Sequence, residues 1–213
     1  AVEFEYDFRS RTYESVNGAD PIVGRERVFV TASYGTGTAA LGLDADGAFE
    51  ERWRTKRIGL QFSNPVFVDG QLYAIDGIGG RAGALVCLDP ATGKELSRTD
   101  LNWDDDIERG GERRTLASSV GEGSLLHVDG RFLVLGDAGH LLWVEASPEG
   151  ARVVARAWPF RADESWSPPV VHRGLLYLCQ NNRESGAYGA DEPRPARLLC
   201  YDLRGALSTS GKR

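Results

Sequence analysis

The sequence lacks the features that mark several classes of protein. It has no methionine, only three cysteines in 213 residues, and no apolar run near the roughly 20 residues that span a bilayer. Cys87, Cys179 and Cys200 are odd in number and lie in apolar runs, which predicts buried small side chains rather than a disulfide framework. Cys179 and Cys200 could still pair across neighbouring strands. The chain opens in strand-like alternation without a charged and apolar leader, so we expect a mature or truncated chain.

Positive charge is also in short supply. The 25 basic residues are outnumbered by 31 acidic ones, which gives a net charge of −6, and the pI is near 5.2. Binding to a nucleic-acid backbone depends on clustered Lys and Arg that create a positive field. The composition therefore argues against a nucleic-acid partner.

Glycine, in contrast, is abundant. The 26 glycines fall mostly between short apolar runs, as expected for many tight turns that join short strands. Hydrophobic residues make up 41% of the chain and charged residues 26%, the balance of an ordinary globular domain. These features predict an all-β fold.

A repeat runs through the sequence. The pattern of apolar run, tight turn and apolar run occurs four times, at residues 21–32, 64–75, 124–135 and 168–179. Asp69-Gly70 and Asp129-Gly130 are strong hairpin signals, because Asp and Gly accept the positive φ angles of a type I′ turn. A unit of four strands repeated every 40 to 45 residues or so is typical of a β-propeller.

The remaining strands complete each unit. Third strands are predicted at 39–44, 84–89, 141–146 and 197–202, ending in acidic residues that can cap turns, and outer fourth strands at 49–56, 93–101 and 152–160. We thus predict a single domain over 1–205, four blades of four antiparallel strands at about 20–56, 62–101, 123–160 and 167–205, and a disordered tail at 206–213. Residues 2–9 alternate as an outer strand should. This strand either closes a four-bladed ring by joining the last blade or is the remnant of a preceding blade, in which case the chain is half of an eight-bladed propeller.

The second unit carries a family resemblance. Residues 64–77 (NPVFVDGQLYAIDG) and 84–96 (ALVCLDPATGKEL) resemble the pyrroloquinoline-quinone-like (PQQ-like) repeat of bacterial propellers, with degenerate copies across residues 20–205. Members of this family include quinoprotein alcohol and glucose dehydrogenases and a non-enzymatic propeller lipoprotein of outer-membrane protein assembly. The resemblance implies a propeller of eight blades in most members and a periplasmic or extracytoplasmic location.

The resemblance also allows the enzyme hypothesis to be examined. The dehydrogenases are marked by two adjacent cysteines near the cofactor and by carboxylates and an Asn around calcium. This sequence has no adjacent cysteine pair, and no positions match the catalytic Asp or the calcium ligands. PQQ with calcium is therefore a cofactor that the family suggests and the site residues do not support, and we expect no cofactor.

Candidate ligand-binding residues are expected on the loops that join one blade to the next and on the loops between second and third strands, because these loops converge at one mouth. Recurrent Arg, aromatic and amide side chains there could hold an anionic or sugar-like ligand, and blade-to-blade ion pairs would explain the same residues. The candidates are Arg11, Tyr13, Glu14, Asn17, Arg57, Gln61, Asn64, Arg114, Glu164, Trp166, Asn181 and Asn182. Asn181 and Asn182 begin a long loop, 180–197, which is either functional or disordered.

No catalytic or metal motif emerges. His127, His140 and His172 lack the spacing of a shared metal site, no nucleophile elbow occurs, and the acidic run Trp103-Asp104-Asp105-Asp106 lacks the ligand spacing of a calcium loop and is interpreted as a solvated turn. We hypothesise a non-catalytic binding or scaffolding module for a protein, peptide or carbohydrate. The alternatives are a fragment of a quinoprotein dehydrogenase or other propeller enzyme, and half-propellers that associate with one another.

Overall fold

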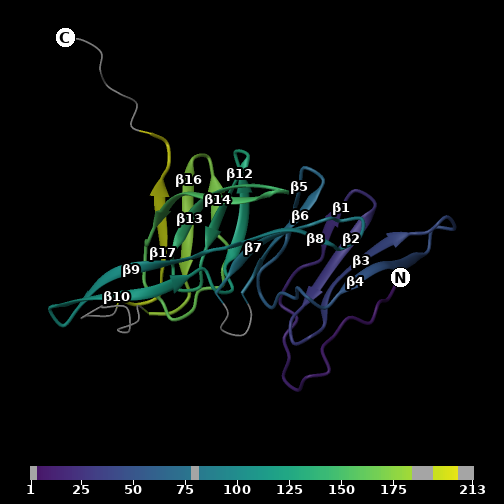
Figure 1. The fold of residues 1–213 in the computed structure, drawn as a ribbon, viewed down its shortest axis with the longest axis horizontal. Helices are drawn as coiled ribbons and strands as arrows, with labels where there is room; N and C mark the ends of the chain where they lie inside the picture. The colour runs from purple at the N-terminus through teal and green to yellow at the C-terminus, as the bar shows by residue number, and fades with distance from the viewer. Residues whose placement is uncertain (1–3, 78–81, 184–193, 206–213) are drawn as a thin grey trace, which may run out of the picture.

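A computed structural model describes residues 4–77, 82–183 and 194–205. These residues form antiparallel β-sheets that follow one another along the chain, with the first and last sheets at opposite ends of the molecule (Figure 1). The described part contains no helix, and so none that could cross a membrane. The predicted tail at 206–213 and most of the loop at 180–197 lie outside the described residues.

Three sheets have four strands each in simple up-and-down order. The first contains β1 (Ile22–Gly24), β2 (Arg27–Ala32), β3 (Gly37–Leu43) and β4 (Phe49–Thr55). The second contains β5 (Val66–Val68), β6 (Gln71–Asp76), β7 (Ala84–Leu88) and β8 (Glu95–Asp100). The third contains β11 (Ser124–Val128), β12 (Arg131–Leu135), β13 (Leu141–Ser147) and β14 (Gly150–Ala157).

The tight turns follow the predicted chemistry. Asp69 and Gly70 have φ angles of 51° and 78°, and Asp129 and Gly130 have 49° and 71°, so both pairs adopt the two positive φ angles of a type I′ turn. Each turn joins a first strand to a second strand in direct register. The two Asp-Gly hairpins are confirmed.

Acidic residues at the ends of third strands cap the next turn in most units. Asp89 accepts hydrogen bonds from the backbone N of Ala91 at 2.8 Å and from the Thr92 hydroxyl at 2.7 Å, and these bonds hold the pKa of Asp89 below its usual range. Asp44 and Asp202 accept backbone N–H bonds in the same way. Glu145 differs, because it pairs with Arg131 and Arg152 instead.

The core lies between the sheets. Phe29 and Ala40 of the first sheet pack against Leu72 and Val86 of the second, and further clusters join the second sheet to the third and the third to the last. Stacked sheets keep apolar side chains between them and polar ones at their edges. This face-to-face stacking is the packing of consecutive propeller blades.

An additional hairpin separates the second and third sheets. β9 (Asn102–Arg109) and β10 (Glu112–Ser119) pair over eight residues each and project away from the sheets (Figure 1). The interpretation of residues 103–106 as a solvated turn was therefore wrong, because they lie within β9. Trp103, Asp105 and Ile107 alternate toward the protein while Asp104 and Asp106 are exposed.

The predicted N-terminal strand is absent from residues 4–9. This segment has no strand pairing and runs beside the first sheet, where the Phe4 ring stacks on Phe49 with centroids 4.7 Å apart. The hydroxyl of Tyr6 contacts Glu51 and Arg54. Its alternation is real, since Phe4, Tyr6 and Phe8 face an apolar pocket while Glu5, Asp7 and Arg9 are exposed. It neither joins the last sheet nor closes a ring.

The last sheet has three described strands, β15 (Val170–His172), β16 (Leu175–Gln180) and β17 (Arg197–Asp202), rather than the predicted four. One face packs on the third sheet through Leu176 and Leu178. The opposite face is open, with Val170 52% and Leu198 67% exposed. The described sheets thus form an open stack and not a closed four-bladed ring.

The three cysteines differ in burial according to their place in the stack of sheets. Cys87 is buried between sheets as expected, Cys179 is half-buried, and Cys200 is exposed on the open face, which corrects the expectation for Cys200. All three are free thiols. Cys179 pairs in register with Leu198, and Cys200 with Tyr177, so the two thiols are diagonal neighbours and form no disulfide.

A substitution at Gly37 tests the close packing of the first sheet. A Cβ atom at Gly37, where φ is +91°, would lie 1.9 Å from the Thr55 carbonyl oxygen. We expect Gly37→Ala to lower the free energy of unfolding by about 3 kcal/mol, measured by urea denaturation. Gly47→Ala is the matched control, because Gly47 has a φ of +81° and open space around it, and it should cost about 1 kcal/mol. Equal losses would contradict the steric argument.

Candidate functional site

The predicted residues lie in four loops and in one β-hairpin. Arg11, Tyr13, Glu14 and Asn17 precede β1, Arg57, Gln61 and Asn64 lie between β4 and β5, Glu164 and Trp166 lie between β14 and β15, and Asn181 and Asn182 follow β16. Arg114 does not belong to these loops. It lies in β10 of the projecting hairpin, because residues 102–119 form strands rather than a loop between blades. Its guanidinium pairs with Glu112 at 2.8 Å.

Two of these loops meet through aromatic rings. Trp166 stacks on Phe62 with centroids 4.3 Å apart, and the Ser124 hydroxyl donates to the Trp166 carbonyl oxygen at 3.2 Å. The adjacent Gln61 donates to the Tyr34 hydroxyl at 2.8 Å. The structure therefore brings Gln61 and Trp166 into one neighbourhood, together with Tyr34, which was not among the candidates.

The predicted amide side chains hold neighbouring loops together. Asn181 accepts a hydrogen bond from the Ser165 hydroxyl at 3.1 Å, and Asn182 contacts the Glu164 carbonyl oxygen at 3.4 Å. Asn64 links the first two sheets, since its Oδ1 accepts from the backbone N of Asp20 at 2.8 Å. Asn17 similarly donates to the Phe8 carbonyl oxygen at 2.9 Å. The contacts of Asn181, Asn182 and Asn64 join different loops, whereas that of Asn17 lies within the N-terminal segment.

The other candidates are exposed. Tyr13 is 87% exposed, and Arg11 and Arg57 also face solvent. Glu14 has a φ of 57° and stands in a turn closed by the Ser15 N–H to Thr12 carbonyl bond. Arg11 of this group lines a pocket.

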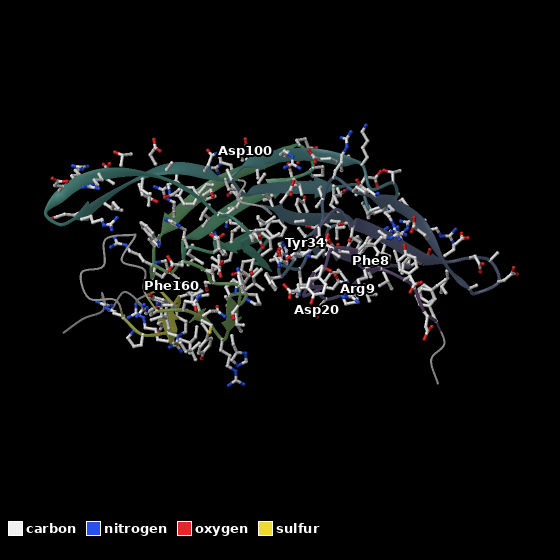
Figure 2. The ribbon with its side chains drawn as sticks, turned by 90° about the horizontal axis from the view of Figure 1, so that it is seen from below. Phe8, Arg9, Asp20, Tyr34, Asp100 and Phe160 are labelled. Carbon is white, nitrogen blue, oxygen red and sulfur yellow. The ribbon has the colours of Figure 1, made fainter. Side chains whose placement is uncertain are left out.

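That pocket, called here the basic pocket, is an open depression of about 590 Å³ on the first sheet. Its lining combines basic and hydroxyl side chains from the N-terminal segment, the β2–β3 turn and the end of β4. The lining residues are Arg9, Ser10, Arg11, Thr12, Tyr34, Gly35, Thr36, Arg54 and Lys56. Figure 2 shows Arg9 and Tyr34 on the same side of the molecule.

Sequence reasoning missed most of this pocket. Arg9 was placed in an outer strand, and Arg54 and Lys56 were placed in the outer strand of the first blade. A signal was present, because Arg9-Ser10-Arg11 and Arg54-Thr55-Lys56 repeat the order of cation, small hydroxyl residue and cation. Nothing in the sequence indicated that the two tripeptides come together.

A second cluster joins the hairpin to the third sheet. His140 is 1% exposed, and its Nε2 lies 2.9 Å from Oδ2 of Asp105. The Trp103 indole N–H donates to the same oxygen at 2.6 Å, and Arg156 lies 3.3 Å from the other. Since an ionised carboxylate only accepts hydrogen bonds, Nε2 carries the proton in the neutral imidazole. Trp158 stacks on the ring at 4.0 Å.

The imidazole of this Asp–His pair is buried, and the Asp105 side chain is 15% exposed. Nδ1 of His140 is buried and has no hydrogen-bond partner, so the nitrogen that a general base would use faces no open space. Burial lowers the pKa of His140 despite the opposing charge of Asp105. Burial acts to raise the pKa of Asp105, but the bonds from Trp103 and Ser118 and the charge of Arg156 bring it below its usual range. The pair anchors the hairpin.

The depressed pKa of His140 predicts a pH dependence of stability. Below about pH 6.5 the unfolded histidine gains a proton that the folded one resists, so the free energy of unfolding falls as pH decreases from 7.5 to 5.5, by up to about 1.4 kcal/mol per pH unit. His140→Gln should flatten this slope in denaturation measured across that range. His172→Gln, at an exposed position, should retain it. An unchanged slope in His140→Gln would contradict the assignment.

Comparison with known proteins adds a fold relationship. No protein-family model and no curated protein matches the sequence. Among solved structures, a europium-containing methanol dehydrogenase matches with a TM-score of 0.52 at 14% identity, over 78% of this chain and 36% of that one. The quinohemoprotein alcohol dehydrogenase from Comamonas testosteroni gives 0.48 at 15% identity, over 86% and 44%, and BamB from Moraxella catarrhalis gives 0.44 at 13%, over 75% and 39%.

These matches concern the fold. The described chain has the fold of PQQ-like β-propellers, as its repeat predicted. At 14% identity the methanol dehydrogenase says nothing about chemistry, since one fold hosts many functions. This chain spans less than half the length of each of the three structures.

Proposed function

We propose that this chain is a non-catalytic propeller module that binds a protein, peptide or carbohydrate outside the cytoplasm. The observation that carries the proposal is the basic pocket, which is open, polar and lined by guanidinium, ammonium and hydroxyl groups. Such groups hold a ligand by charge-assisted hydrogen bonds and do not form an activated nucleophile. The extracytoplasmic location rests on the family resemblance alone.

The burial of the other cluster argues against a catalytic role for it. Asp105 and His140 have the spacing of an acid–base pair, yet Trp103 and Trp158 cover the imidazole and its free nitrogen is buried. A catalytic histidine must reach the proton that it transfers. In this proposal the pair stabilises the protein and takes no part in a reaction.

The alternative is a fragment of a PQQ-dependent dehydrogenase. The residues present do not fit that cofactor with its calcium. No two cysteines are adjacent in the sequence, and in the described ranges no three His, Cys, Asp or Glu side chains are grouped to hold a metal ion. No reaction step is therefore assigned to a quinone.

Thermal stability distinguishes the two functions. A ligand that binds the native state raises the melting temperature, by several degrees when its concentration is 100-fold above Kd. We expect no shift with PQQ and calcium together, measured by differential scanning calorimetry with calcium alone as the control. A rise of several degrees that needs both components would overturn the non-catalytic proposal.

Self-association is a second candidate function, favoured by the open face of the last sheet. Val170, Tyr177 and Cys200 form one row across this face, and Cys179 and Leu198 form the next. The first sheet is covered by its own N-terminal segment, so the two ends of the stack are not equivalent. The face would therefore meet the same face of a second copy, as in an isologous dimer.

Solution mass tests this association. Light scattering should give twice 23.2 kDa for the wild-type chain and 23.2 kDa for Leu198→Asp, because a carboxylate on this face would be desolvated in the dimer. Val154→Asp is the control, an exposed apolar residue on β14 and away from this face. A monomeric wild-type chain would rule out the second candidate and leave the first untouched.

A further inference from the structure

The basic pocket holds unpaired positive charge in an acidic protein. Arg9, Arg11 and Lys56 line it, and none has an ionic partner among the residues that the structure describes. Arg54, the fourth cation, is paired with Glu51 at 3.0 Å. Like charges gathered at one concave site repel one another and focus a positive field, which an anionic ligand relieves.

Local structure fixes the first two cations side by side. Ser10 is buried between them, where its hydroxyl donates to the Tyr34 carbonyl oxygen at 3.3 Å and accepts from the Thr12 N–H at 3.0 Å. In an extended segment successive side chains point to opposite faces. Because Ser10 points inward, Arg9 and Arg11 both point outward, about 6.6 Å apart along the chain.

Arg54 in β4 and Lys56 directly after β4 supply a second pair, again two residues apart in the sequence. Thr55 separates Arg54 and Lys56, and its hydroxyl accepts a bond from the Arg57 N–H at 3.3 Å. The Arg54 guanidinium also lies over the Phe8 ring, 5.1 Å from its centroid, which ties this strand to the N-terminal segment. The pocket therefore contains two rows of cations, each with a period of two residues.

We propose that the basic pocket binds an extended acidic segment of a partner protein, with carboxylates at alternate positions. This inference rests on the proposed binding function and names its ligand class. An extended peptide places every second side chain on one face at the spacing found in each row. A compact anion such as phosphate would engage one end of the rows only. The Tyr34 hydroxyl at the pocket edge accepts a bond from Gln61, and its own O–H can donate to the peptide backbone.

The test uses two labelled peptides of one composition, an alternating Glu-Thr hexapeptide and a block peptide of three Glu followed by three Thr. Fluorescence polarisation at low salt should show the alternating peptide binding at least about fivefold more tightly to the wild-type chain. Arg9→Gln/Arg11→Gln should weaken its binding about tenfold or more, since charge-assisted bonds are lost.

The control variant changes the same net charge elsewhere. Arg109→Gln/Arg152→Gln alters positions on β9 and β14 and should leave peptide affinity within about twofold, because neither residue lines the basic pocket. Equal binding of the two peptides, or equal loss in both double variants, would overturn the inference. Binding of a sulfated polysaccharide without the alternating peptide would also overturn it, while leaving the broader binding function intact.

Discussion

The structure depends on one constraint, namely that a small antiparallel sheet must cover its apolar face with another layer. A single repeat unit cannot bury its apolar face alone, and stacking neighbouring sheets buries a continuous core. The second and third sheets meet this need on both sides, through Val86 and Leu142 among others. The two ends of the stack meet it differently: the N-terminal segment covers the first sheet, and nothing described covers the outer face of the last.

The fold was predictable where the local signal matched the final environment. Asp69-Gly70 specifies its turn whatever surrounds it, so the hairpins and their order could be predicted from sequence. Alternation alone was less informative. Residues 4–9 alternate because one side meets the first sheet, which needs no strand pairing. In 102–119 the acidic run concealed the alternation of Trp103, Asp105 and Ile107, although Gly110-Gly111 marked a turn.

The candidate site was predictable only in part. Propeller geometry indicated which loops converge, and Gln61 and Trp166 do lie in one neighbourhood with Phe62. The basic pocket was not predicted, because its cations come from an N-terminal segment and an outer strand that the repeat assigns to different roles. The contact between Asp105 and His140 was also missed, because the two residues are far apart in the sequence. A contact between distant segments depends on tertiary packing, which no local pattern records.

The path of the N-terminal segment both covers the first sheet and forms part of the basic pocket. Phe4, Tyr6 and Phe8 face the apolar pocket on the first sheet, and this packing sets the path of the N-terminal segment. The hydrogen bond from Ser10 to the Tyr34 carbonyl oxygen holds the end of the segment against the β2–β3 turn. The odd-numbered residues of the segment must then face solvent. Arg9 and Arg11 therefore line the same pocket as Arg54 and Lys56. The alternation that places aromatic side chains against the first sheet therefore also places the basic side chains on the solvent side of the segment. A segment that covers an apolar face can thereby present a binding surface without added secondary structure.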